Sequence, residues 1–194
     1  MSTLEWVAAL AGAISVCLSA RENIWNWPTA IVNLALYIIV FWRTGLYSDM
    51  GLQVIFLILS IYGWYEWLYG GEHRTELTVS RATRRQWLSA TPIALIFWII
   101  LATNTARLPG VALPYLDSGL ATVSLVAQWM MTRKLLENWV LWIAVDIIYV
   151  PMYVYKGLPV TAALYAVFLV LAVIGLRSWR RSYQQRFVPE LTPA

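Results

Sequence analysis

Long hydrophobic runs, separated by short polar segments, dominate the chain. Seven of these runs approach or reach the roughly 17–25 residues that a helix needs to cross a bilayer, although the second and fifth are short. Trp and Tyr gather near the ends of the runs, where membrane proteins place their aromatic belts. The pattern predicts an all-α integral membrane protein with seven transmembrane helices. They are expected at about 3–20, 27–42, 50–69, 87–106, 116–132, 138–155 and 158–176.

The basic residues between these helices predict their orientation. If the N-terminus lies outside, the inside segments hold Arg21, Arg74, Arg81, Arg84, Arg85, Arg133, Lys134, Arg177, Arg180, Arg181 and Arg186. The outside segments then hold only Arg43, Arg107 and Lys156. Because inside loops of membrane proteins are rich in Lys and Arg, we expect the chain to run N-out/C-in. The polar stretch 70–86 becomes a cytoplasmic loop, and 181–194 a basic cytoplasmic tail.

The third and seventh predicted helices resemble each other without gaps at one constant shift, which takes Gly45 to Gly157 and which we call the repeat shift. The other matching pairs are Leu46 with Leu158, Leu52 with Leu164, Phe56 with Phe168, Leu57 with Leu169, Leu59 with Leu171, Gly63 with Gly175 and Trp67 with Trp179. Helices four spans apart run in the same direction. The repeat therefore predicts two parallel three-helix bundles, about 3–69 and 116–179, joined by a linker helix at about 87–106 (3+1+3). We expect one transporter domain over 1–180, because such repeats hold substrate between their halves.

Composition argues against several classes of function. Charged residues make up 12% of the chain, against about 25% in soluble domains. The net charge of +4 does not indicate nucleic-acid binding, because the basic residues lie at membrane edges and not in one patch. Cys17 and His73 are single residues of their types, so no disulfide, metal cluster or histidine base is expected. The chain also lacks a phosphate-binding Gly-Lys loop. We expect no catalytic residue, metal or cofactor.

Residues of the sixth predicted helix form the strongest candidate site. At about 100° per residue, Trp139, Trp142 and Asp146 fall within roughly 60° of one another, and Tyr149 lies on or beside the same stripe. An ionised Asp at membrane depth costs roughly 2.5–3.5 kcal/mol, so it usually faces a partner or a watery cavity. Two indoles and a carboxylate suit a flat cationic ligand. The alternative is a packing stripe whose Asp bonds to a neighbouring helix.

Two amides inside the hydrophobic runs are further candidates for substrate contact. Asn33, in the second helix, lies near the position of Asp146 in the other half if a gap is allowed in the repeat. Gln128 lies in the fifth helix. Either amide can bond a ligand hydroxyl or carboxamide, and either can equally bond across helices for about 0.6 kcal/mol. Gln53 and Asn104 are interpreted as structural.

These segments resemble the PnuC family of bacterial vitamin transporters over about residues 5–180. The resemblance rests on Leu46-Tyr47, Leu52-Gln53, Tyr62-Gly63-Trp64-Tyr65-x-Trp67, Met131-Thr132-Arg133-Lys134, Glu137-Asn138-Trp139-x-x-Trp142 and Gly157. It implies seven or more helices in a bacterial inner membrane. It also implies facilitated diffusion of an unphosphorylated vitamin precursor, which a cytoplasmic kinase traps by phosphorylation.

The same resemblance bears on the substrate. Nicotinamide riboside is the best-known substrate of the family, and related members carry thiamine or riboflavin. In riboside carriers the paired Trp side chains stack on the pyridine ring, and an Asn typically follows four residues after the second Trp. That position is Asp146 here, which favours thiamine as the alternative. Both vitamins present a cationic ring that Trp139, Trp142 and Asp146 would accept, whereas riboflavin is neutral and larger. We expect nicotinamide riboside first.

Other mechanisms remain open at this point. A proton-coupled transporter that uses Asp146 would accumulate substrate under a pH gradient. A membrane scaffold or sensor would lose folding, with no ligand affinity to lose, on Trp139→Ala or Asp146→Asn. For the carrier, the hypothesis is that the two bundles rock about a central site in which Trp139 and Trp142 sandwich the ring. The sequence indicates no oligomeric state.

Overall fold

The structure is a computed structural model that describes residues 3–45, 47–108 and 113–185. This part of the chain contains seven α-helices and one turn of 3-10 helix. The helices are α1 (Thr3–Ala20), α2 (Asn26–Thr44), α3 (Tyr47–Tyr69), α4 (Arg84–Thr105), α5 (Pro114–Thr132), α6 (Glu137–Tyr155) and α7 (Pro159–Gln185), and the 3-10 turn η1 is Glu72–Arg74. The predicted all-α fold with seven helices is confirmed. Residues 186–194, most of the predicted tail, lie outside the described residues.

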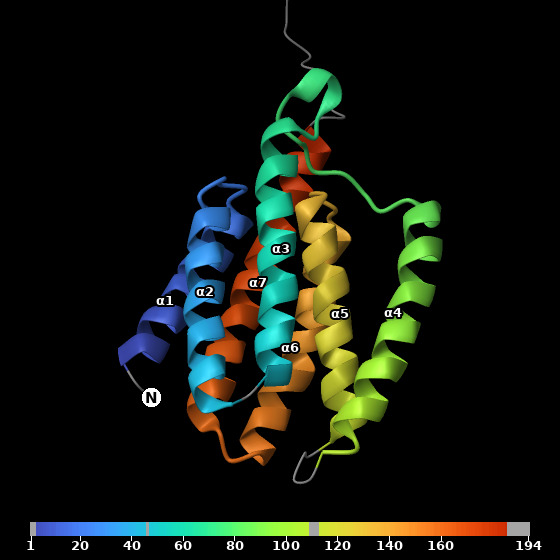
Figure 1. Cartoon of the computed structure of the whole chain (residues 1–194). Helices are drawn as coiled ribbons and strands as arrows, with labels where there is room; N and C mark the ends of the chain where they lie inside the picture. The colour runs from blue at the N-terminus through green and yellow to red at the C-terminus, as the bar shows by residue number, and fades with distance from the viewer. Residues whose placement is uncertain (1–2, 46, 109–112, 186–194) are drawn as a thin grey trace, which may run out of the picture.

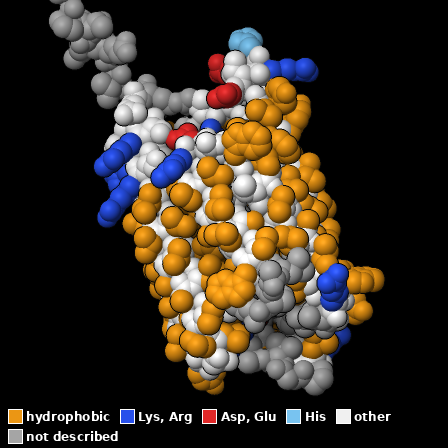
Figure 2. Space-filling model, turned by 90° about the vertical axis from the view of Figure 1, so that its left-hand side faces the viewer, with side chains coloured by type: hydrophobic (Ala, Val, Ile, Leu, Met, Phe, Trp, Pro, Cys, Tyr) orange, Lys and Arg blue, Asp and Glu red, His pale blue; other side chains and the backbone are white. Residues whose placement is uncertain are grey.

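The hydrophobic surface agrees with a protein that lies in a membrane. Among the described residues, α3, α4, α6 and α7 are long and apolar enough to cross a bilayer, and Trp6–Ala20 of α1 forms a shorter apolar helix. Figure 2 shows hydrophobic side chains over the middle of one face, while most of the charged side chains in view gather near one end. Large apolar residues of α4, such as Leu88, Ile93 and Ile96, are exposed, as expected for side chains that face lipid.

Six of the helices pack into a closed ring, and the seventh lies outside it. Around the ring each helix contacts the next, in the order α1, α2, α3, α5, α6, α7 and back to α1. Helix α4 packs on α5, at the side of the bundle (Figure 1). Gly119 of α5 lets the indole of Trp98 approach closely, and the Trp98 Nε1 donates to the Tyr115 carbonyl at 2.9 Å. The ring consists of the two predicted three-helix bundles, and α4 connects them.

The two halves repeat the same backbone geometry at the predicted repeat shift. In the α1–α2 turn Glu22 has φ 56°, and in the α5–α6 turn the equivalent Lys134 has φ 48°. The residue after each also donates the same hydrogen bond, from Asn23 to the Leu18 carbonyl and from Leu135 to the Met130 carbonyl. Gly45 and Gly157, which follow α2 and α6, both have φ 73°. The left-handed conformation explains why both positions hold glycine.

Four tryptophans at equivalent positions form the core where the halves meet. Trp27 lies edge-on to Trp67, with ring centroids 5.3 Å apart, and Trp139 lies edge-on to Trp179 at 5.5 Å. Trp67 and Trp179 then meet each other at 5.8 Å. All four side chains are at most 2% exposed. Edge-to-face contacts of this kind favour burial of large rings, so we call these residues the tryptophan core.

Glycines and exchanged hydrogen bonds hold the tryptophan core in place. A Cβ on Gly63 would collide with the Trp27 ring, and one on Gly175 would collide with the Trp139 ring. The Trp67 Nε1 donates to the Met131 carbonyl of the other half at 3.0 Å. The Trp179 Nε1 donates back to the Ser19 carbonyl at 2.9 Å. Since the repeat shift also takes Ser19 to Met131, the two bonds are equivalent under the repeat, and each half anchors the other.

Candidate functional site

Helix α6 carries a buried carboxylate inside the ring of helices. The Asp146 side chain is 3% exposed. No hydrogen bond or ion pair to this carboxyl occurs among the described residues. The alternative in which Asp146 bonds a neighbouring helix is therefore not what the structure shows. Because buried charged groups are normally paired, Asp146 is the strongest indication of a ligand site in this chain.

A cluster of three tyrosines lies beside Asp146. Tyr149 is 9% exposed, and its ring lies 5.4 Å from that of Tyr153 and 4.7 Å from that of Tyr165 on α7. Tyr153 and Tyr165 stack at 5.0 Å. Asp146 lies near enough to Tyr149 and Tyr165 to interact with them electrostatically. These rings provide flat π-surfaces within reach of a carboxylate, an arrangement that suits an aromatic cation.

The tyrosine cluster leads toward charged residues at the end of the ring where α6 ends. The Lys156 Nζ lies 3.5 Å from an Asp117 carboxylate oxygen and 5.7 Å from the centre of the Tyr153 ring. Asp49, at the start of α3, is close enough to interact with both Asp117 and Lys156. Asp49 and Asp117 therefore supply carboxylates at this end of the ring, which also carries Lys156, Arg43 and Arg107.

The two predicted stacking residues have different surroundings. Trp139 belongs to the tryptophan core and is 1% exposed. Its Nε1 has no hydrogen-bond partner in the described residues, and the same holds for its equivalent, Trp27. Trp142 is half-buried and packs against the tryptophan core from the side. The structure shows no ring contact between Trp139 and Trp142 among the described residues. Of the two, Trp142 is the less buried indole.

The two candidate amides both bond to other helices in this structure. The Asn33 Nδ2 donates to the Ala8 carbonyl of α1 at 2.6 Å, beside Gly12. The Gln128 Nε2 lies 3.4 Å from the Ser60 Oγ of α3, a long hydrogen bond that joins the two bundles. Ser60 is fully buried. Gln128 and Ser60 together thus offer polar atoms inside the ring, whereas Asn33 serves the α1–α2 contact.

In the gap-free register the equivalents of Asn33 and Leu34 are neighbouring residues. The repeat shift takes Asn33 to Val145, and the residue equivalent to Asp146 is Leu34. Asn33 thus lies one residue from the position of Asp146, and a gap of one residue would align the two. Leu34 is 9% exposed and Asp146 is 3% exposed, so both point inward. The carboxylate consequently makes the two halves of the site chemically different.

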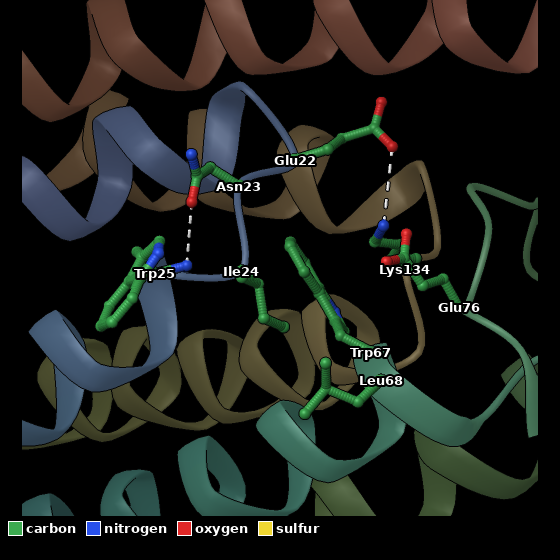
Figure 3. Close-up of a pocket in the computed structure, with 8 residues that line it drawn as sticks. All are labelled: Glu22, Asn23, Ile24, Trp25, Trp67, Leu68, Glu76 and Lys134. Atoms are coloured by element: carbon green, nitrogen blue, oxygen red, sulfur yellow. Dashed lines mark hydrogen bonds and ion pairs between the residues drawn. The ribbon is translucent and has the colours of Figure 1, made fainter.

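A pocket lies at the other end of the ring, which carries the α1–α2 turn, the α3–α4 connection and the α5–α6 turn. We call this end the basic end, because these connections hold many of the Arg and Lys residues. The volume of the pocket is about 380 Å³. Its lining includes Glu22, Trp25, Trp67, Leu68, Glu76 and Lys134. Figure 3 shows Trp25 and Lys134 on opposite sides of the pocket. The Lys134 Nζ lies 3.7 Å from a Glu22 oxygen and 4.4 Å from the centre of the Trp67 ring.

Residues 75–83, which we call the strap, cross the basic end between the two bundles. The backbone of Leu77 donates to the Trp67 carbonyl of α3, and that of Ser80 exchanges hydrogen bonds with Lys134 and Leu136 of the α5–α6 turn. Val79 is 3% exposed and packs into the tryptophan core. The segment 70–86 was predicted as a polar loop. In the structure its middle is anchored, and α4 already begins at Arg84.

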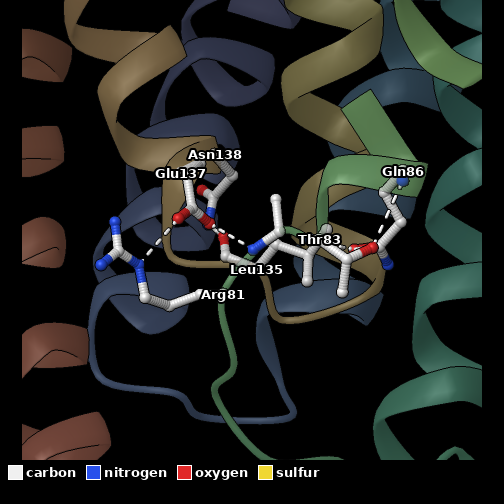
Figure 4. Close-up of polar contacts among 7 residues, drawn as sticks. Arg81, Thr83, Gln86, Leu135, Glu137 and Asn138 are labelled. Carbon is white, nitrogen blue, oxygen red and sulfur yellow. Dashed lines mark hydrogen bonds and ion pairs between the residues drawn. The ribbon is translucent and has the colours of Figure 1, made fainter. Parts of the chain in front are cut away.

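Glu137 is the residue that fixes the far part of the strap (Figure 4). Its carboxylate accepts from the Arg81 Nε at 3.1 Å and from the Ala82 backbone at 2.8 Å. Next along the chain, Thr83 caps α4 through a reciprocal pair of bonds with Gln86. In the sequence, the Glu-Asn-Trp motif was interpreted as a substrate site because of its Trp. In the structure, its Glu holds the strap.

Sequence reasoning missed that Asn26-Trp27 and Asn138-Trp139 are equivalent residues under the repeat shift. Extending the repeat shift upstream from the third helix would have found it, because both residues match without a gap. That match predicts that Trp139 has a partner in the half that lacks the carboxylate. A residue repeated in both halves is more readily explained by packing than by contact with a single ligand.

Comparisons with known proteins identify relatives of this chain. The family model described as Nicotinamide mononucleotide transporter matches residues 2–181. The nicotinamide riboside transporter PnuC of Escherichia coli is 28% identical over 211 residues, which cover 96% of this chain and 88% of the relative. The riboflavin/roseoflavin transporter RibM of Streptomyces davaonensis is 25% identical, with 98% and 91% covered. A crystal structure of the vitamin B3 transporter PnuC matches with a TM-score of 0.72 at 27% identity, over 94% of this chain and 82% of that chain.

Proposed function

This chain belongs to the nicotinamide mononucleotide transporter family, and from that premise we propose that it carries an unphosphorylated vitamin precursor with a cationic aromatic ring. The chain is a multi-pass membrane protein related to vitamin transporters and not to enzymes, and a bacterial inner-membrane location is consistent with its relatives. Nicotinamide riboside is the leading candidate, because PnuC proteins named for it are among the relatives.

The observation that carries this proposal is the unpartnered Asp146 carboxylate at 3% exposure. An ionised Asp at membrane depth costs roughly 2.5–3.5 kcal/mol on insertion scales. A cationic ligand that binds beside it offsets this cost, whereas a neutral ring such as that of riboflavin does not. Between Asp146 and the carboxylates of Asp49 and Asp117 lie tyrosines whose rings can also interact with a cation.

We assign roles to the site residues as follows. Trp142 and Tyr149 stack on the cationic ring, and Asp146 supplies the opposite charge or accepts from a ribose hydroxyl. Gln128, with Ser60, bonds the polar part of the substrate. Trp139 and Asn33, two further candidates from the sequence, position helices in this proposal: Trp139 through the tryptophan core, and Asn33 through its bond to Ala8.

The proposed mechanism is facilitated diffusion by alternating access. The two bundles rock about the site, so that it opens toward one mouth of the ring at a time, as in other transporters built from repeats. The N-out/C-in orientation would place the basic end in the cytoplasm. A cytoplasmic kinase would then trap the vitamin by phosphorylation, which keeps the net flow inward without ATP hydrolysis by this chain.

Thiamine is the second candidate, and Asp146 is the observation that favours it. The resemblance implies an Asn at this position in riboside carriers, and a carboxylate accepts hydrogen bonds but donates none when ionised. An aminopyrimidine that donates, next to a thiazolium cation, suits such an acceptor. Asp146→Asn is therefore expected to lower affinity for thiamine by roughly tenfold or more, because hydrogen bonds to charged groups contribute about 1.5–3 kcal/mol.

Calorimetry on the purified protein with nicotinamide riboside, thiamine and riboflavin in parallel tests the proposal. We expect one of the two cationic vitamins to bind at micromolar or lower concentration, and riboflavin to bind more weakly. Counterflow in proteoliposomes, without a gradient of any ion, should then move the vitamin that binds. Accumulation that requires an imposed pH gradient would instead indicate proton coupling. Folded protein that binds none of the three would contradict the proposed substrate class.

A further inference from the structure

The pocket at the basic end already holds a cation on an aromatic face. The Lys134 ammonium lies over the Trp67 ring at 4.4 Å and beside the Glu22 carboxylate at 3.7 Å. The Lys134 side chain is 9% exposed, so its charge is largely withdrawn from water. An indole, a carboxylate and a cation thus meet here in the same combination that the proposed central site offers to its substrate.

The cluster lies where equivalent turns of the two halves meet. Glu22 and Lys134 are equivalent residues under the repeat shift, and each is the left-handed residue of its turn. Their ion pair therefore joins the two bundles where the repeat brings equivalent turns face to face. The strap crosses between the two bundles at the same end.

We propose that this pocket is a second, weaker site for the same class of ligand, an aromatic cation, and that Lys134 is its built-in competitor. The inference rests on the proposed function. An arriving cationic ring takes the place of the ammonium on Trp67 and beside Glu22. Displacement of Lys134 then breaks the ion pair that closes the basic end.

The chemistry of the lining favours a cation over an anion. Glu22 and Glu76 face the pocket against the single ammonium of Lys134, so displacement of that ammonium leaves two carboxylates. Trp25 is 66% exposed and gives a ligand an open stacking surface. Its backbone is fixed by a bond from the Trp25 N–H to the Asn23 Oδ1 at 2.9 Å. The volume of about 380 Å³ lies in the range of about 300–1,000 Å³ that small-molecule sites occupy.

Protection of an introduced thiol tests the pocket directly. Cys17 is the only native cysteine, so Cys17→Ser with Leu68→Cys leaves one thiol, in the pocket lining. We expect nicotinamide riboside or thiamine, whichever binds in calorimetry, to slow maleimide labelling of this thiol at concentrations well above those that fill the central site. The matched control is Thr78→Cys in the same background, an exposed strap residue, whose labelling should not change.

Variants of Lys134 and Asp146 separate the pocket from the central site. Lys134→Gln should lower the ligand concentration for half-protection by roughly three- to tenfold, because the competing cation is gone, and Lys134→Arg, which keeps the charge, should not. Protection must also persist with Asp146→Asn. Its loss there would show that labelling follows the central site, which overturns the inference.

The two proposals fail in different ways. Calorimetric binding to the native chain, with no protection of Leu68→Cys at any concentration, overturns the second site and leaves the proposed function standing. Absence of calorimetric binding overturns the proposed function, and the second site with it.

Discussion

Trp139 and Trp142 lie about one turn apart on α6, yet the structure gives them different surroundings. We predict that Trp139→Ala lowers the free energy of unfolding by about 3–5 kcal/mol, since it removes a large side chain from a packed core. Its equivalent, Trp27→Ala, should cost a similar amount. Trp142→Ala should cost less stability but lower ligand affinity by roughly tenfold through the lost cation–π contact. Thermal unfolding in detergent and calorimetry measure the two effects.

The matched pair Trp27 and Trp139 decides this prediction. If folded Trp139→Ala protein loses ligand affinity while Trp27→Ala protein does not, Trp139 contacts the substrate. That result would support the hypothesis that Trp139 and Trp142 sandwich the ring. Equal behaviour of the two variants supports packing. Affinity unchanged in folded Trp142→Ala protein would remove that residue from the site.

For single residues, the sequence predicted which side chains are candidates for the site but not what surrounds them. Asp146 was recognised as costly in a hydrophobic run, and the structure places it buried without a partner among the described residues. Periodicity put Trp139 on the same stripe, yet a helical stripe cannot show which of its members meet a glycine on the next helix. The contact of Trp139 with Gly175 is a tertiary fact that only the repeat could have indicated.

The strap gives a prediction at the scale of an element. Glu137→Gln keeps the shape of the side chain but removes the charge that pairs with Arg81 and binds the Ala82 N–H. We expect the melting temperature to fall by a few degrees, because the charged hydrogen bond is worth about 1.5–3 kcal/mol where it is shielded and less where Arg81 is exposed. Cleavage within 75–83 by a protease should become faster.

Arg81→Gln serves as the control for the strap. The Arg81 side chain is 65% exposed, so its loss should have a smaller effect than loss of the Glu137 charge, which also serves the Ala82 N–H. Equal effects of the two variants would mean that the ion pair, and not the backbone contact, holds the strap.

Elements differ in how far the sequence predicted them. Helix ends agree to within about three residues because long apolar runs leave little choice in a bilayer, except at α7, which was predicted to end at 176 and continues to Gln185. The start of α4 was placed at 87 and lies at Arg84, because the capping box of Thr83 and Gln86 extends the helix outside the hydrophobic run. The stretch 70–86 was predicted as a cytoplasmic loop from its polar composition, whereas two apolar residues of the strap, Leu77 and Val79, pack with the tryptophan core.

For the whole molecule, the repeat was the most informative pattern in the sequence. It predicted two parallel bundles, and the ring of helices with its exchanged Trp67 and Trp179 bonds follows that symmetry. What the repeat could not predict is where the halves differ. Asp146 corresponds to Leu34 in register, and Glu22 corresponds to Lys134, so a nearly symmetric scaffold carries an asymmetric charge arrangement.

This symmetry predicts that the ion pair at the basic end can be reversed. Glu22→Lys alone puts two ammonium groups together and should destabilise the protein by about 1–3 kcal/mol, since Lys134 is largely buried. In the double variant Glu22→Lys with Lys134→Glu, the new lysine lies relative to Trp179 as Lys134 lies relative to Trp67, because Trp67 and Trp179 are equivalent under the repeat. Thermal unfolding of the two single variants and the double variant gives the coupling energy. We expect the double variant to recover most of the lost stability. The strap has no counterpart among the described residues of the second half. A double variant no more stable than Glu22→Lys would show that the strap sets the geometry of this pair and that the repeat does not.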